Sequence, residues 1–523
     1  MVMAGYLLSR ATGLLREIAI SAQFGTSADL GAYRAAFKVT DLLYMVIIGG
    51  ALGSSFIPVF IQVWERDGRE RAWHLASAIV TWALLVLAVA SAVLWLLAPW
   101  LTVWLYGGPD ITPATLDLIT RLTRLFLLSP LLLGLGGLAM AALNARERFA
   151  LPALAPAIYN IGIIGGALLL APTMDIWGLA WGVVAGAALY LVVQLPGLWA
   201  LGMQLRPTLG RRMAEVRSVA IQMGPRVLGQ AASQISILVT AALTARLALG
   251  AQLLAGLDYA YQLLLLPYGI FSLSLSTVAF PRLSRLYSEG NLPELMDSIR
   301  RTLRTILLLT LPATVALLVL AVPLVRLLFQ RGAFDEQSLL YTVVPLMGYA
   351  TALPAFAAAE ILIRSFYAMQ RTWTPVLVGL LQVSLNLGLG SLALALGGGV
   401  GMLALAFSIA NNIEALLLMV LLGRRLPGIW RSRETWRTIG AAALATLVLA
   451  GWLWALRTLS QPFLPFLAVA GPYRWPADVV PLVLWLAVAG ASGALLYTLL
   501  AALFGASEAR AVLARLRRGP RSG

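Results

Sequence analysis

Charged side chains interrupt the apolar segments of this sequence, and six of them fall in the first two segments. They are Arg10, Arg16, Glu17, Arg34, Lys38 and Asp41. The spacings of four and three between Arg34, Lys38 and Asp41 place all three on one face of a helix. An ionisable group within a bilayer is costly unless it faces water or a partner, and arginine presents a planar fork that suits phosphate oxygens. These residues therefore indicate a site that binds an anion.

The geometry of the first segment limits how these charges can meet. Arg10 and Glu17 share one helical face, whereas Arg16 points about 120° away on an ideal helix, so convergence requires a bend at Gly13. The alternative is that each charge snorkels to a membrane surface or pairs on its own helix, as Lys38 would with Asp41. Later segments carry further charges that this alternative explains less well as a group: Arg226, Arg246, Asp258, Glu360, Arg364 and Glu414.

The composition is that of an integral membrane protein. Of 523 residues, 60% are hydrophobic and 11% are charged, and the mean hydropathy is +0.87. The absence of cysteine and the single histidine argue against thiol chemistry and a histidine-rich metal centre, so no cofactor is expected. The net charge of +16 is explained by retention of basic residues on the cytoplasmic side, and we expect no nucleic-acid partner.

The apolar segments and the turns between them predict an all-α protein with fourteen transmembrane helices. The expected ranges are 3–24, 32–64, 73–106, 115–145, 149–173, 176–204, 213–249, 252–287, 295–329, 336–369, 373–396, 399–423, 436–458 and 479–505. Loops between them alternate between arginine-rich and arginine-poor, which is the pattern that consecutive spans produce. This alternation predicts that both termini lie in the cytoplasm.

Three proline-containing motifs recur at an offset of 223 to 224 residues, pairing Pro58 with Pro281, Pro99 with Pro323, and Pro152 with Pro375. The recurrence favours a duplicated six-helix unit. We expect an N-terminal lobe at 1–205, a C-terminal lobe at 206–426, and two added helices with a basic tail at 427–523. Parallel repeats of this kind predict two pseudo-symmetric lobes around a central cavity, with transport by alternating access.

The sequence contains no phosphate-binding loop, because its glycine-rich stretches lack the Lys and Ser/Thr that cradle a nucleotide. We therefore expect an ion gradient or the membrane potential to supply the energy. A set of polar residues on two later helices is a candidate site for a coupling monovalent cation: Asn386, Asn411, Asn412 and Glu414. Packing between helices is the more common use of such asparagines.

Several sequence motifs, in the same order along the chain, resemble those of the MurJ (MviN) lipid II flippases of the multidrug/oligosaccharidyl-lipid/polysaccharide exporter superfamily. They are "SRATGLLREIAISAQFG", "AYRAAFKVTDLLYMVIIGGALGSSFIPVF", "ALNARERFALPALAPAIYNIGII", "MGPRVLGQAASQIS", "FQRGAFD" and "FYAMQRTWTPV". The resemblance implies fourteen helices in two lobes. It also implies that the chain carries undecaprenyl-diphosphate-linked peptidoglycan precursor from the inner to the outer leaflet, with membrane lipids and cell-wall synthases as candidate partners.

Family arginines that hold the diphosphate match Arg10 and Arg16, and Lys38 matches a basic position in the second helix. Two other family arginines are replaced by Tyr44 and Gln262, which hydrogen-bond but carry no charge. With Glu17, Arg34 and Arg226, these residues complete the expected substrate-binding set. The lost charge is either compensated by residues such as Arg34, Arg226 or Arg246, or it marks a different cargo.

Two other functions are consistent with parts of the sequence. The same fold could carry another polyprenyl-linked oligosaccharide, such as an O-antigen, capsule or teichoic acid unit. A membrane glycosyltransferase or ligase would need paired carboxylates on an outer loop, whereas Asp110, Asp175 and Asp478 are isolated. We therefore expect a transporter and not an enzyme.

Overall fold

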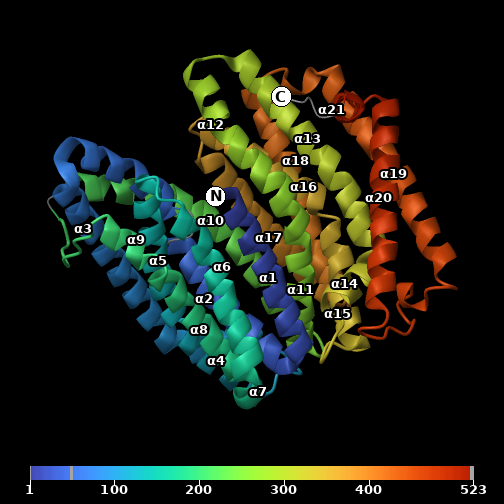
Figure 1. The fold of residues 1–523 in the computed structure, drawn as a ribbon, viewed down its shortest axis with the longest axis horizontal. Helices are drawn as coiled ribbons and strands as arrows, with labels where there is room; N and C mark the ends of the chain where they lie inside the picture. Colours follow the sequence, from blue (N-terminus) through green and yellow to red (C-terminus); the bar gives the residue numbers. More distant parts are fainter. Residues whose placement is uncertain (1, 48–50, 212, 519–523) are drawn as a thin grey trace. The chain divides into compact units, whose positions relative to one another are not determined.

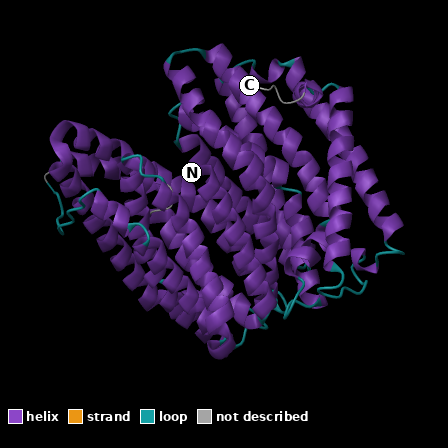
Figure 2. Cartoon of the chain, in the orientation of Figure 1, coloured by secondary structure: helices purple, strands orange, loops and turns teal. Residues whose placement is uncertain are grey.

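The computed structural model describes residues 2–47, 51–211 and 213–518, and in these ranges every regular element is a helix (Figure 2). Contacts divide the chain into two compact units, of which unit 1 is Met1–Ala255 with Gly332–Phe334, and unit 2 is Gly256–Arg331 with Asp335–Gly523. The expected lobe boundary at 205 precedes α10 (Ala214–Thr244), which packs against α2 and α3 in unit 1. The division into six-helix repeats stays a prediction.

Unit 1 is built from both long and short helices (Figure 1). Before α10 they are α1 (Val2–Phe24), α2 (Ala28–Ile47), α3 (Ala51–Tyr106), α4 (Pro113–Phe126), α5 (Leu128–Ala145), α6 (Ala150–Gly165), α7 (Ala171–Met174), α8 (Ile176–Val192) and α9 (Leu195–Ala200). A π-helical turn at Gly166–Leu170 joins α6 to α7. α1 packs along the apolar helix α6, which in turn packs on α8.

Unit 2 begins within α11 (Gly250–Pro267), which a π-helical turn at Tyr268–Leu273 connects to α12. The remaining helices are α12 (Ser274–Ser288), α13 (Leu292–Val319), α14 (Ala321–Phe329), α15 (Glu336–Ala350), α16 (Leu353–Ala368), α17 (Trp373–Ala395), α18 (Val400–Arg425), α19 (Arg433–Ser460), α20 (Val479–Phe504) and α21 (Ser507–Arg518). Short 3-10 turns lie at Ile429–Arg431 and Pro465–Leu467. α18 packs on α15, α16 and α17, whereas α19 and α20 pack together beside α13.

Two of the differences from the predicted elements concern a loop and the C-terminal tail. The loop expected at 65–72 is helical on both sides of Gly68, whose positive φ of 81° alone breaks α3. The flanking Glu and Arg residues are good helix formers, and glycine adopts this backbone conformation without a steric cost. The arginine-rich tail, expected only as a basic extension, forms the helix α21.

Ten helical segments in the described ranges are long and apolar enough to cross a membrane. The pair α15 and α16, bent by 51°, would make an eleventh if it forms one span. The charged helices α1 and α2 fall outside this set, and α10 contributes only the shorter apolar stretch Gln234–Thr244. The chain is therefore an all-helical, multi-pass membrane protein.

Glycines allow α6 and α8 to approach closely. A Cβ atom added at Gly166 would lie 2.5 Å from the Cα of Gly182, and one added at Gly162 would lie 2.4 Å from the Cα of Gly186. Small residues at this spacing let two membrane helices bring their backbones into contact. Because α1 packs against α6, the close contact between α6 and α8 also helps to fix the helix on which α1 lies.

We expect Gly166→Ala to destabilise unit 1, because its methyl group would force α6 from α8. Such overpacking costs about 1–3 kcal/mol. Thermal unfolding in detergent should show a midpoint lowered by several degrees. The matched control is Gly165→Ala, since a Cβ at Gly165 meets nothing within 4 Å. Equal midpoints for the two variants would contradict the close contact.

Candidate functional site

Three of the predicted site residues form a buried ion cluster in unit 1. Glu17 on α1 lies between two arginines and is 3% exposed. Its Oε1 atom accepts hydrogen bonds from Nε and Nη2 of Arg16, at 3.0 and 2.7 Å. Its Oε2 atom accepts from Nη2 of Arg34 on α2, which is 5% exposed. Two guanidinium groups thus share one carboxylate, and these three side chains carry a net positive charge.

Asn160 on α6 completes this cluster, and the sequence analysis did not identify it. Its Oδ1 atom accepts a hydrogen bond from Nη1 of Arg16 at 3.0 Å. Its Nδ2 atom donates to the backbone oxygen of Ser9 and to Oγ1 of Thr12, at 3.3 Å each. The amide therefore orients Arg16 and ties α6 to α1. A single amide side chain within the uncharged, apolar range 149–173 was the available signal in the sequence.

The other predicted substrate-binding residues of unit 1 differ in their exposure and surroundings. Arg10 is exposed, and Lys38 is half-buried with contacts of its own. Tyr44 is half-buried and packs against the apolar core that contains Phe56 and Phe60. The side chain of Arg226 lies outside the part of the chain that the structure describes.

Arg246, one of the residues considered as a replacement for the missing family arginines, lies at the end of unit 1 that carries the 107–112 turn. It is exposed and donates from Nη2 to the backbone oxygen of Trp104 at 3.4 Å. The structure does not bring it to the Glu17 cluster, because α10 ends at Thr244 and Arg246 follows in the turn.

Unit 2 also contains a cluster of charged and polar side chains within its helices. Glu360 on α16 accepts a hydrogen bond from the Tyr268 hydroxyl at 2.9 Å and one from Nε of Arg364 at 2.7 Å. Tyr268 begins the π-helical turn after α11, so this group joins that turn to α16. Arg364 is thus paired with Glu360 on its own helix. The predicted residue Gln262 is half-buried on α11.

The four residues of the candidate cation site differ in their surroundings. Asn386 on α17 and Asn411 on α18 are buried, at 1% and 3% exposure, on two helices that pack together. Asn411 and Asn412 donate to backbone oxygens one turn back on their own helix, at 2.8 and 2.7 Å. Asn412 is exposed and Glu414 is half-buried. The assignment of these residues to ion coupling stays a prediction.

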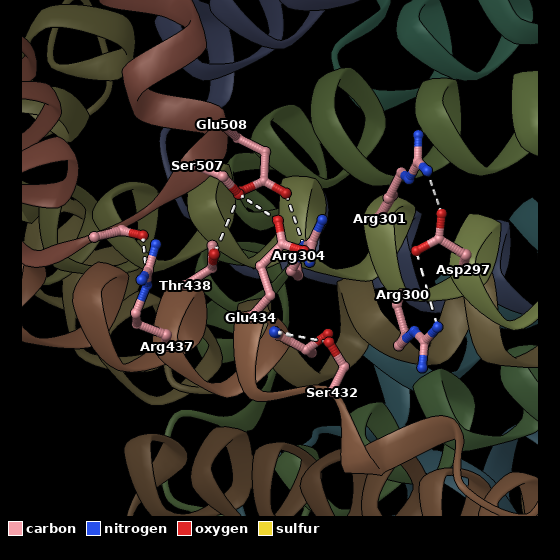
Figure 3. Close-up of polar contacts among 12 residues, drawn as sticks. Asp297, Arg300, Arg301, Arg304, Ser432, Glu434, Arg437, Thr438, Ser507 and Glu508 are labelled. Atoms are coloured by element: carbon pink, nitrogen blue, oxygen red, sulfur yellow. Dashed lines mark hydrogen bonds and ion pairs between the residues drawn. The ribbon is translucent and has the colours of Figure 1, made fainter.

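A third cluster of charges in unit 2 has a structural role. Figure 3 shows the carboxylates of Glu434 and Glu508 turned toward Arg304, at distances of 3.3 and 2.7 Å from its nitrogens. Arg304 on α13 is 5% exposed, and the Ser507 hydroxyl lies 2.9 Å from a carboxylate oxygen of each glutamate, between which it shares its one hydrogen. The cluster connects α13, α19 and α21, so it fixes the C-terminal helix to unit 2.

Solved structures show which fold this chain shares. A transporter of the MATE family, itself in the MOP superfamily, in an inward-facing conformation matches with a TM-score of 0.67 at 13% identity, covering 81% of this chain and 96% of that one. A structure titled lipid II flippase MurJ, inward closed conformation, matches with a TM-score of 0.75 at 23% identity, covering 96% and 98%. The fold is thus that of the MOP transporters.

Sequence comparison identifies the family within this class. The family model described as lipid II flippase MurJ matches residues 20–471. The lipid II flippase MurJ of Burkholderia cenocepacia is 30% identical over 459 residues, which cover 85% of this chain and 87% of that protein. A probable lipid II flippase MurJ of Vibrio cholerae is 29% identical over 475 residues, covering 88% and 89%. The chain belongs to the MurJ lipid II flippase family.

Proposed function

We propose that this chain moves lipid II, the undecaprenyl-diphosphate-linked precursor of peptidoglycan, from the inner to the outer leaflet of the bacterial plasma membrane. Family membership over residues 20–471 carries the proposal. The buried cluster of Arg16, Glu17 and Arg34 supports it, because two guanidinium groups facing one carboxylate leave positive charge for an anionic head group. The assigned activity is transport and not catalysis.

Within this function, we propose that Arg10, Arg16 and Lys38 contact the diphosphate. Arg16 is the central residue, since Glu17 and Asn160 hold its guanidinium in place and its side chain remains 19% exposed. Prior orientation of the fork reduces the entropy that would be lost when a phosphate binds. Glu17 and Arg34 act as positioning residues, since Glu17 holds the Arg16 guanidinium in place and Arg34 holds Glu17.

The same proposal includes fourteen spans and cytoplasmic termini. In this proposal the ten apolar segments and the bent pair account for eleven spans. The remaining three spans are α1, α2 and α10. α1 is long enough to cross the hydrocarbon layer, at 23 residues. α1 is not among the apolar segments because it carries charged residues. Glu17, however, is buried within unit 1 and pairs with Arg16 and Arg34, so these charged side chains need not face lipid.

Complementation tests the proposed function. When the resident lipid II flippase of a walled bacterium is depleted, expression of this chain should restore growth, and Arg16→Ala should not. The substitution removes the guanidinium group that binds phosphate. Of the two arginines in the cluster, only Arg34 then remains to pair with Glu17. Arg69→Ala, at an exposed position directly after the break in α3 at Gly68, is the matched control and should restore growth. Failure of the wild-type chain at normal membrane abundance would refute the proposal.

A second candidate cargo is another polyprenyl-linked oligosaccharide. The observation in its favour is that Tyr44 and Gln262 stand where the family resemblance leads one to expect arginines. Competition binding of the purified chain with lipid II and with an undecaprenyl-diphosphate-linked O-antigen unit separates the two. Preference for the O-antigen unit would reassign the cargo and leave the fold unchanged.

A further inference from the structure

A groove on the surface of unit 1 lies between α3 and the junction of α4 with α5. Its cavity volume is about 460 Å³, and its lining includes Ala92, Trp95, Arg124, Leu127, Leu128 and Leu131. Trp95 and Leu128 are 47% and 45% exposed, and α3 here belongs to the most apolar of the candidate spans. A groove in such a surface faces the bilayer, so lipid is the material that fills it.

The groove contains one cationic side chain that no carboxylate neutralises among the described residues. Nε of Arg124 donates to the backbone oxygen of Trp95 at 3.1 Å, and its guanidinium lies 4.2 Å from the centroid of the Trp95 ring. Arg121, one turn earlier on α4, instead pairs with Asp117 at 2.8 Å. The Trp95 contacts hold the Arg124 fork at the groove and leave its positive charge without a counter-ion.

The position of Arg124 along its helix matches the depth of lipid phosphates. Arg124 follows Pro113, the first residue of α4, by a length of helix of about 16 Å. The whole segment Pro113–Ala145 is about 50 Å long, whereas the hydrocarbon layer is about 30 Å thick. Arg124 therefore starts just inside the hydrocarbon, and its side chain points back toward the helix N-terminus and the head groups.

Exposed tryptophans mark the same membrane surface. Trp100 and Trp104 on α3 are 67% and 61% exposed, and their rings stack with centroids 6.3 Å apart. Tryptophan gathers where hydrocarbon meets head groups. Trp95 lies on α3 about one and a half turns below Trp100 and two and a half below Trp104, which places the groove beneath the head-group layer.

We propose that this groove is a binding site for an anionic phospholipid. Its phosphate accepts hydrogen bonds from the Arg124 fork, and an acyl chain lies along Leu128 and Leu131. The combination of a fixed, uncompensated guanidinium with apolar walls matches a lipid that carries net negative charge better than a zwitterionic one. The site is in the leaflet at the 107–112 end, which the proposed orientation makes the outer leaflet.

Native mass spectrometry of the full chain in detergent tests the site, with phosphatidylglycerol and phosphatidylcholine as probes. The wild-type chain should retain phosphatidylglycerol preferentially, and Arg124→Gln should weaken that binding about tenfold, as expected when a charge-assisted hydrogen bond is lost. Arg121→Gln is the matched control and should bind as the wild type does. Leu128→Trp fills the groove without changing its charge and should also weaken binding, which keeps the test decisive if Arg124→Gln does not fold.

Three results would overturn the assignment. The first is unchanged phosphatidylglycerol binding in folded Arg124→Gln, or in Leu128→Trp when Arg124→Gln does not fold. The second is equal retention of the two phospholipids by the wild-type chain. The third is displacement of phosphatidylglycerol by undecaprenyl phosphate at lower concentration, which would assign the groove to polyprenyl lipids.

Discussion

Glu17→Gln is expected to abolish transport and to destabilise unit 1, the largest functional effect of any single change described above. The carboxylate accepts three hydrogen bonds from Arg16 and Arg34. A neutral amide at position 17 would leave the guanidinium groups of Arg16 and Arg34 close together without the carboxylate that they share. Removing one partner of a buried ion pair costs about 3–5 kcal/mol. Growth after depletion of the resident flippase should therefore not be restored.

The effect can be separated from a general loss of acidic charge. Glu65→Gln makes the same chemical change at an exposed position of α3 and should restore growth fully. The double variant Glu17→Gln with Arg34→Gln returns the cluster to its original net charge. It should regain part of the thermal stability that Glu17→Gln loses, because the two positions are in direct contact. Normal growth with Glu17→Gln alone would show that the ion cluster is dispensable.

Arg326→Met is expected to release the loop between α19 and α20. Arg326 on α14 is fully buried and donates to the backbone oxygens of Phe466, Val469 and Gly471, at 2.8, 3.1 and 2.8 Å. It also pairs with Glu336 on α15 at 2.9 Å. Methionine would fill much of the volume but leave the carbonyls without donors, and each unsatisfied group costs about 1–3 kcal/mol.

Limited proteolysis and thermal unfolding measure this release. The 461–478 loop of Arg326→Met should be cut about tenfold faster than in the wild type, as a loss of 1.4 kcal/mol in closing the loop would produce. Its unfolding midpoint should also fall. Arg474→Met changes an exposed arginine in the same loop and should behave as the wild type does. Unchanged cleavage in Arg326→Met would mean that the loop is held by other contacts, such as Arg457 to the oxygen of Leu467.

The predicted helices agree closely with the structure because apolar length and glycine or proline turns are local properties. The range predicted at 373–396 is Trp373–Ala395, and the range predicted at 479–505 is Val479–Phe504. Breaks inside long segments were harder to foresee. The bend between Ala350 and Leu353 and the π-helical turns depend on how neighbouring helices pack, and hydropathy does not record that.

The sequence by itself determined the class of protein, the helical segments and the presence of uncompensated charge among apolar residues. Each follows from composition or from spacing along one helix. Only the tertiary structure decided which charges meet. Arg34 is seventeen residues from Glu17 and Asn160 is 144 from Arg16, yet both pairs are in contact. Such pairing depends on how α1, α2 and α6 are packed and rotated, and those angles are set by contacts distant in sequence.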